Sequence, residues 1–350
     1  LQLLQGMSQM TTKRWVNKPE GSNWGRFGDD DQRGKMNLLT PERRVAAARE
    51  VKEGVAFTLS LPLDYPGGNA IFAHRKAPVL QYEKRGGAAY NFNFKLSHIC
   101  AEYCDIVCDD AVLLYLQYST QWDGLSHVGQ MFDADGDGVP EKVYYNGWRG
   151  GVDLVGPEDA KEGFGAHKLG VENFATAGVQ GRGVLVDLNR IYGRRKAFVG
   201  YDDLMRALDA QKVGVEAGDF LCLYTGYGDL IMEMNKQPDV DVLHHSCAAL
   251  DGRDTRLLQW ITDTDLVAIC SDSLAVEVFP PRPAEGDSFP MLPLHNHCLF
   301  KQGVHLGELW YFTELAQWLA AHDRWRFQLT APPLRLPGAV GSPATPVAVV

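Results

Sequence analysis

A dense run of polar side chains lies at residues 117–127, directly after an apolar segment. The run reads Gln-Tyr-Ser-Thr-Gln-Trp-Asp-Gly-Leu-Ser-His and brings two amides, a carboxylate and an imidazole close together in sequence. Such groups destabilise a protein beside a core strand unless they pair with one another, with a metal or with a ligand. We therefore expect Gln117, Gln121 and Asp123 to converge on one point, with His127 on the following turn. The alternative is a polar loop whose side chains bond only their own backbone.

These residue types predict chemistry on a carbonyl group, either with or without a metal. In the first case a divalent ion polarises the carbonyl and lowers the pKa of a water molecule, while His127 transfers the proton. In the second case Gln117 and Gln121 hydrogen-bond the carbonyl, and His127 works with Asp123. Histidine suits the proton transfer because its unperturbed pKa lies near neutrality. The sequence contains no G-x-S-x-G motif, which argues against a serine nucleophile of that kind.

The elements that must position these side chains alternate between helices and strands. Thr40, Pro41 and Glu42 supply a cap, a first-turn proline and an acidic first turn, which predict a helix that ends near Val51. Short runs rich in strand formers predict strands at 55–61, 111–118, 184–188, 220–224 and 266–270. The strand at 111–118 should be buried and should present the polar run at its end. This alternation favours an α/β fold.

Composition limits the class of protein. We expect one domain over residues 16–350, preceded by a tail at residues 1–15 whose start reads as upstream or added sequence. A formal net charge of −10 argues against a nucleic-acid partner, which needs clustered Lys and Arg. No run approaches the roughly 20 apolar residues of a membrane-spanning helix, so we expect a cytoplasmic protein with no membrane partner. Seven cysteines, an odd number, fit reduced thiols better than a disulfide framework.

Three residues of the polar run match the signature H-x-G-T-H-x-D-x-x-x-H of the cyclase family, which this chain resembles: Thr120, Asp123 and His127. The signature's first His, its Gly and its second His are replaced here by Gln117, Ser119 and Gln121. Further similarity covers Trp24-Gly25, Asn37–Glu42, Gly181–Asp187, Gly218-Asp219, Thr225-Gly226, Ser271-Asp272, Glu277 and Gly341–Pro343. The resemblance therefore spans nearly the whole chain.

The resemblance implies the fold and site of the family, the group of kynurenine formamidase and isatin hydrolase. The fold would be a mixed sheet with flanking helices in a swivelling β/β/α arrangement, assembled as a homodimer or larger homo-oligomer. In the family two His and the Asp bind a divalent metal, often zinc or manganese, and the last His acts as acid or base. Asp123 would then be a ligand and His127 the acid or base. His295 and Glu308 would complete the site, with His297 as the alternative to His295.

The two glutamines change the expected metal. Neutral imidazole suits zinc, whereas an amide oxygen is a hard, weak donor that suits manganese, magnesium or calcium. We therefore expect Gln117, Gln121, Asp123, His295 and Glu308 to hold a divalent ion, manganese in preference to zinc. The open alternative is a site that uses no metal.

The expected function is hydrolysis of an amide, formamide or cyclic amide in a small metabolite. A lactone is the closest alternative, because the same polarisation of a carbonyl serves an ester. From other classes we keep a metal-free lyase or cyclase of a polyketide-like metabolite, and a non-catalytic small-molecule binder. Four residues are expected to contact the substrate, although core packing explains each aromatic equally well: Thr120, Trp122, Tyr144 and Tyr145.

A second acidic segment, Asp133–Gly138, imitates the start of an EF-hand calcium loop, with acidic residues at alternate positions. Its twelfth position is Tyr144 where an EF-hand has glutamate, and Pro140 interrupts it. We do not expect a true EF-hand here.

Overall fold

The structure is a computed structural model that describes residues 14–350. Its centre is a nine-stranded sheet in the order β1-β21-β19-β13-β15-β17-β18-β8-β20. The middle strands β13, β15, β17 and β18 run parallel, and the flanking pairs are antiparallel. The bounds are β1 (Ala56–Thr58), β8 (Gln121–Asp123), β13 (Gln180–Asp187), β15 (Phe220–Tyr224), β17 (Ala268–Ser271), β18 (His305–Glu308), β19 (Arg326–Thr330), β20 (Gly341–Pro343) and β21 (Val347–Val349).

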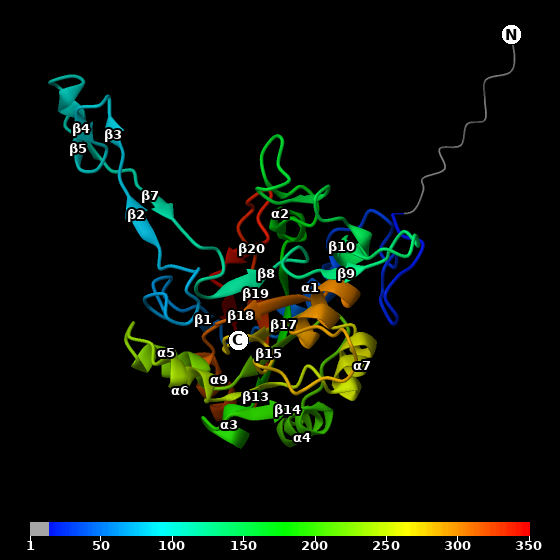
Figure 1. The fold of residues 1–350 in the computed structure, drawn as a ribbon. Coiled ribbons are helices and arrows are strands. Elements are labelled where there is room, and N and C mark those ends of the chain that lie inside the picture. The colour runs from blue at the N-terminus through cyan, green and yellow to red at the C-terminus, as the bar shows by residue number, and fades with distance from the viewer. Residues whose placement is uncertain (1–13) are drawn as a thin grey trace, which may run out of the picture.

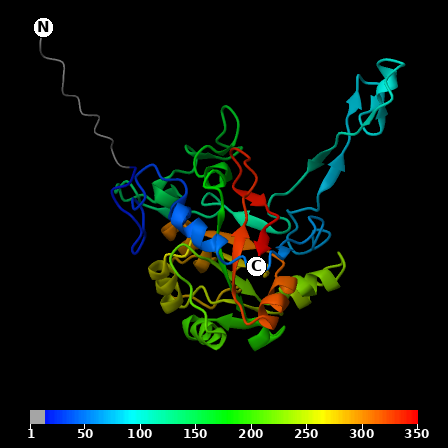
Figure 2. The same ribbon diagram turned by 180° about the vertical axis from the view of Figure 1, so that it is seen from behind.

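Helices cover both faces of this sheet, as Figures 1 and 2 show. Successive strand residues point to opposite faces. One face therefore packs against α4 and α7, and the other against α9 and the segment before α1. The predicted mixed sheet with flanking helices is confirmed. The helices are α1 (Pro41–Ala48), α2 (Val171–Ala175), α3 (Asn189–Tyr192), α4 (Tyr201–Gln211), α5 (Tyr227–Glu233), α6 (Val240–His244), α7 (Thr255–Thr264), α8 (Pro293–His295) and α9 (Thr313–Ala321).

Several predicted elements form close to their expected bounds. Helix α1 begins at Pro41, and the side chain of Thr40 accepts a hydrogen bond from the Arg43 amide as its cap. The helix ends at Ala48, three residues before the expected Val51. The predicted strands at 55–61, 184–188, 220–224 and 266–270 correspond to β1, β13, β15 and β17.

The predicted buried strand at 111–118 is wrong. Only Ala111–Leu113 form a strand, β7, and they pair with β2 (Val79–Gln81) in a ribbon that is exposed on both strands. This ribbon belongs to a projection, residues 76–115, which we call the arm; it extends away from the body in both views (Figures 1 and 2). The other short pairs are β3 (Lys84–Arg85)·β4 (Ala89–Tyr90), β5 (Phe94–Lys95)·β6 (Ile106–Val107), β9 (Gln130–Phe132)·β10 (Glu141–Val143), β11 (Leu154–Val155)·β12 (Gly165–Ala166) and β14 (Ala197–Val199)·β16 (Ala248–Leu250).

Trp15, which we placed in the N-terminal tail, is 6% exposed and packs edge-to-face against Trp24, with ring centroids 5.8 Å apart. The rest of the expected tail, apart from Arg14, lies outside the described residues. Within the described part of the chain, no helix has the length and apolar character needed to cross a membrane.

A buried histidine makes the folded state sensitive to acid. The ring of His305 packs on Phe174, with centroids 4.2 Å apart, and neither ring nitrogen has a hydrogen-bond partner within residues 14–350. Burial lowers the pKa of His305 to about 3. The unfolded chain takes up this proton near pH 6.5, whereas the folded chain takes it up only near pH 3. The free energy of unfolding therefore keeps its full value above about pH 6.5 and falls by about 1.4 kcal/mol per pH unit as the pH drops toward 3.

His305→Leu should therefore reduce the loss of unfolding free energy between about pH 7.5 and about pH 5 by about 2 kcal/mol. Urea unfolding at the two pH values measures this difference. His322→Leu is the matched control, because His322 is exposed and its replacement should leave the loss unchanged. Equal acid sensitivity of wild type and His305→Leu would contradict the assignment.

Candidate metal centre

The site begins on strand β8, whose residues alternate between two faces of the sheet. Gln121 and Asp123 point to one face, and Trp122 points to the other. Gln121 pairs with Glu308 on β18, so their side chains lie on the same face. Gln121 Nε2 donates to Glu308 Oε2 at 2.9 Å and to Asp123 Oδ1 at 3.2 Å. The three side chains are buried.

His295, at the end of α8, completes this cluster. Its Nε2 lies 3.1 Å from Glu308 Oε1 and 3.7 Å from Asp123 Oδ2. Its Nδ1 lies 2.7 Å from Glu277 Oε1, and Glu277 also accepts the backbone amides of Leu294 and His295. This carboxylate fixes the orientation of the ring, the usual arrangement around a histidine ligand.

The cluster concentrates negative charge where there is little water. Burial raises the pKa of the Asp123 carboxyl, and Glu308 adds to this effect, whereas His127, His295 and Arg75 oppose it. Burial also acts to lower the pKa of His295, but the hydrogen bonds to Glu277 and Glu308 outweigh it and raise that pKa to about 10. Three buried carboxylates surrounding one imidazole form a site that favours a cation.

Two observations show that a metal ion fits here. One ligand atom from each of Asp123, His295 and Glu308 can be chosen so that all three atoms lie within 4.8 Å of one another. Asp123 Oδ2 and Gln121 Oε1 are buried and have no hydrogen-bond partner among residues 14–350. Buried oxygens of this kind are normally satisfied, so Asp123 Oδ2 is free to bind an ion, whereas Gln121 Oε1 would reach that ion only after its amide rotates. Asp123, Glu308 and His295, with Gln121 in addition, would hold it.

Gln117 lies beside the cluster. Its side-chain amide packs over Gly341, the residue that pairs with Asp123 across β8 and β20. A Cβ at Gly341 would lie 2.4 Å from Gln117 Nε2, so the two residues are in close contact. The structure therefore brings Gln117, Gln121 and Asp123 to one region, as the sequence predicts.

His127 faces the cluster from the following turn. Its Nε2 lies 3.8 Å from Asp123 Oδ1, beyond hydrogen-bond distance, and its side chain is 21% exposed. An imidazole that is partly exposed next to a buried carboxylate can reach a bound molecule without losing contact with the centre.

A small cavity lies next to Gln117. It is lined by Phe72, Arg75, Gln117 and Leu309 together with the loop at 66–69. Arg75 Nη1 donates to the backbone oxygen of Gln117 at 2.9 Å, and its guanidinium lies 4.5 Å from the centre of the Phe72 ring. No carboxylate within the described chain forms an ion pair with Arg75, so the guanidinium keeps donors for a ligand.

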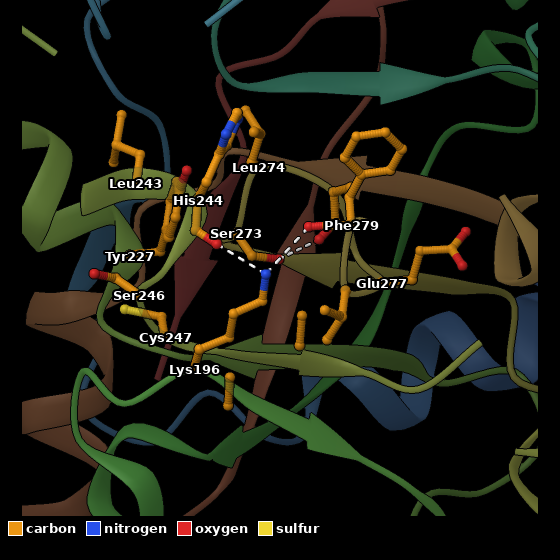
Figure 3. Close-up of a pocket in the computed structure, with 14 residues that line it drawn as sticks. Lys196, Tyr227, Leu243, His244, Ser246, Cys247, Ser273, Leu274, Glu277 and Phe279 are labelled. Atoms are coloured by element: carbon orange, nitrogen blue, oxygen red, sulfur yellow. Dashed lines mark hydrogen bonds between the residues drawn. The ribbon is translucent and has the colours of Figure 1, made fainter. Parts of the chain in front are cut away.

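A second cavity borders the centre from another side, and Figure 3 draws the residues that line it. Lys196 Nζ donates there to the carbonyl oxygens of His244 at 2.8 Å and Phe279 at 3.3 Å. Glu277 is one of the residues that line this cavity, but in Figure 3 the carboxylate of Glu277 points away from the other side chains. This orientation agrees with the hydrogen bond to His295.

Three of the four residues expected to contact substrate do not reach the site. Trp122 is fully buried on the opposite face of the sheet, against Trp310, and its Nε1 donates to Ala331. The Thr120 hydroxyl bonds the backbone of Leu61 and Leu309, and Tyr145 is fully buried in the core. Their positions assign all three to the packing of the fold.

Tyr144, the fourth, is half-buried and packs on Gly129, two residues after His127.

The structure selects His295 over His297. The Nε2 atom of His297 lies 3.0 Å from Thr262 Oγ1 on α7, and burial lowers the pKa of His297 to about 4.

The acidic loop brings Asp133, Asp135 and Glu141 together. There Arg149 pairs with Glu141 and lies 3.7 Å from Asp135, so a cation of the protein already neutralises two of these three carboxylates.

Sequence reasoning missed two residues. Glu277 stands within the stretch that resembles the family, but nothing in the sequence shows that it supports His295. Arg75 lies 42 residues before Gln117 and carries no motif, so only the fold reveals that the two meet.

Comparison with known proteins identifies the family of this chain. A family model described as a putative cyclase matches residues 57–278. A solved structure described as a novel cyclase is 33% identical, covers 94% of this chain and 99% of its own, and has a TM-score of 0.74. A search of curated proteins gives no match.

Isatin hydrolases share the fold at low identity. Isatin hydrolase A from Labrenzia aggregata, solved with benzyl benzoate, is 12% identical with a TM-score of 0.50, covering 87% of this chain and 95% of its own. An isatin hydrolase bound to the product analogue thioisatinate is 11% identical with a TM-score of 0.50, covering 89% and 99%. The family model over more than half of the chain and the relative at 33% identity establish that this chain belongs to the cyclase family.

Proposed function

We propose that this protein is a divalent-metal-dependent hydrolase that cleaves the C–N bond of a small amide, formamide or cyclic amide. The observation that carries the proposal is the buried group of Asp123, His295 and Glu308, in which Asp123 Oδ2 has no hydrogen-bond partner among the described residues. When bound, a divalent ion supplies Lewis acidity toward the substrate carbonyl and makes water more acidic.

The protein's own residues supply the remaining functions. Glu277 holds the His295 ring so that Nε2 points into the cluster. The partly exposed His127 takes a proton from the attacking water and returns it to the leaving nitrogen. Arg75 and Gln117 line the adjacent cavity and offer N–H donors to the polar end of a substrate.

The glutamines support manganese in preference to zinc. Gln121 donates its Nε2 to two carboxylates, but rotating the amide would present Oε1 to the same space. An amide oxygen with two carboxylates and one imidazole makes an oxygen-rich donor set, which suits manganese.

An amide is favoured over a lactone because fold relatives bear the name isatin hydrolase, and isatin is a cyclic amide. The same polarisation of a carbonyl would serve an ester, so a lactone stays the nearest alternative.

One observation favours a second candidate, a metal-free lyase or cyclase. The contacts from Gln121 Nε2 to Asp123 and Glu308, with a cationic His295 between Glu277 and Glu308, neutralise part of the cluster without an ion. Gln117 would then bind the substrate carbonyl directly, and Gln121 would do so by giving up one of these two carboxylates.

The test is turnover of isatin, N-formyl anilines and small lactones by protein that has been treated with chelator and then reloaded with manganese. We expect loss of amide hydrolysis in chelator and its return with manganese. Turnover that chelator does not change would favour the metal-free candidate, and binding without turnover would indicate a small-molecule binder.

A further inference from the structure

The cavity drawn in Figure 3 is lined by none of the proposed metal ligands. Its volume is about 50 Å³. One water molecule needs about 10–15 Å³ on this scale, so the cavity holds a molecule of only a few non-hydrogen atoms. Leu243, Leu274 and Val278 are among its apolar walls, and the exposed residues His244 and Phe279 line it as well, so it opens to solvent.

The first polar group in this cavity is the hydroxyl of Tyr227. The residue is 3% exposed, and its Oη has no hydrogen-bond partner among residues 14–350. Buried hydroxyls are normally hydrogen-bonded. Burial raises the pKa of the Tyr227 phenol, so the group stays protonated and can donate to an acceptor that enters the cavity.

The backbone around Tyr227 is held in place by a buried carboxylate. Asp272 accepts the backbone amides of Thr225 at 2.8 Å, Gly226 at 2.9 Å and Gly228 at 3.4 Å. Tyr227 therefore starts helix α5 in a fixed position. A donor that is already ordered loses little freedom when a ligand binds.

The second polar group is the ammonium of Lys196. Two of its three N–H groups donate to the carbonyl oxygens of His244 and Phe279, which are neutral acceptors. Within the described chain no carboxylate forms an ion pair with Lys196. The acidic residue in the cavity wall, Glu277, bonds His295 and points away in Figure 3. One N–H and the positive charge are therefore left for a ligand.

These two donors and the apolar walls fit a small carboxylate. Its two oxygens can accept one hydrogen bond from the ammonium of Lys196 and one from the hydroxyl of Tyr227, and its negative charge matches the single positive charge. Its hydrocarbon end would contact the apolar walls. A phosphate or sulfate would need further cations, and a chloride ion would leave the apolar walls without a contact.

We propose that this cavity is a binding site for a small carboxylate anion, about the size of acetate, held by Lys196 Nζ and Tyr227 Oη. The site needs no metal, and its ligand binding does not depend on the proposed hydrolysis.

The test is titration of chelator-treated protein with sodium acetate at constant ionic strength, followed by saturation-transfer NMR of the acetate methyl group. Wild type should bind acetate saturably, with a dissociation constant in the millimolar range because so small an anion makes few contacts. Tyr227→Phe and Lys196→Met should each weaken binding by about tenfold or more, since each removes a hydrogen bond to a charged ligand. Tyr227→Phe should fold normally, because the lost hydroxyl has no partner among the described residues.

Two control variants match these changes outside the cavity. Tyr145→Phe removes another buried hydroxyl that has no hydrogen-bond partner within residues 14–350. Lys52→Met removes an exposed positive charge. Both controls should bind acetate as tightly as wild type.

Three results would overturn the proposal. The first is the absence of saturable binding, and the second is binding that Tyr227→Phe and Lys196→Met leave unchanged. The third is binding that Arg75→Met abolishes and Tyr227→Phe does not, which would place the anion in the cavity beside Gln117. Displacement of acetate by chloride as readily as by propionate would overturn the assignment to a carboxylate.

Discussion

Glu308→Ala should abolish both metal retention and catalysis. Glu308 lies at the centre of the buried cluster, where its two oxygens contact Gln121 and His295. Removing the carboxylate takes away one ligand and leaves His295 without one of its two acidic partners. Loss of the metal's charge stabilisation, worth several kcal/mol, corresponds to a fall in turnover of about 10³-fold or more. Hydrolysis rates and elemental analysis of the same samples measure the two effects.

Glu308→Gln keeps the shape of the side chain and separates loss of charge from loss of packing. Glu314→Ala is the matched control, because Glu314 is an exposed carboxylate in the first turn of α9. It should retain wild-type metal content and turnover. Full metal content in both Glu308 variants, with folding verified by circular dichroism, would exclude Glu308 as a ligand.

His127→Ala should lower turnover by about 10²- to 10⁴-fold, the usual contribution of a general acid–base group. Its Nε2 is 3.8 Å from Asp123 Oδ1, and the side chain is 21% exposed, so it lies beside the centre and is still open to solvent. Because His127 is not among the proposed ligands, the variant should keep the metal. This combination of low turnover and full metal content distinguishes His127 from Glu308.

His167→Ala serves as the control for His127, since His167 is exposed and belongs to no part of the site. Its turnover should equal that of wild type. Wild-type turnover in His127→Ala would refute the acid–base role, and loss of metal from that variant would move His127 into the ligand set.

The sequence predicts the candidate site better than it predicts the strand that carries it. Gln121 and Asp123 share a face because they lie two residues apart on one strand, and Gln117 lies over Gly341, the cross-strand partner of Asp123. The strand is the polar segment Gln121–Asp123 itself, whereas the apolar run at 111–118 had been expected to fill that role. Apolar runs predict burial only when the fold supplies a partner, and here the run enters the arm.

Trp122 was expected to contact the substrate, and the same two-residue period explains why it does not. Asp123 and Trp122 are adjacent in sequence, so on a strand they must point to opposite faces. Recognising 121–123 as a strand would have placed Trp122 in the core. Contacts between distant segments, such as Glu277 with His295 or Arg75 with Gln117, leave no local pattern in the sequence and follow only from the order of the strands.

The most direct test of the metal centre is elemental analysis of the purified protein after dialysis against metal-free buffer and again after manganese loading. Glu308→Gln is measured in parallel. Because this variant changes only the buried centre, metal bound at the acidic loop around Asp133 would remain in it. We predict one manganese ion per chain in wild type and none in Glu308→Gln. A wild type that retains no metal in either state would contradict the proposed centre and would leave Gln117 and Gln121 to contact the substrate directly.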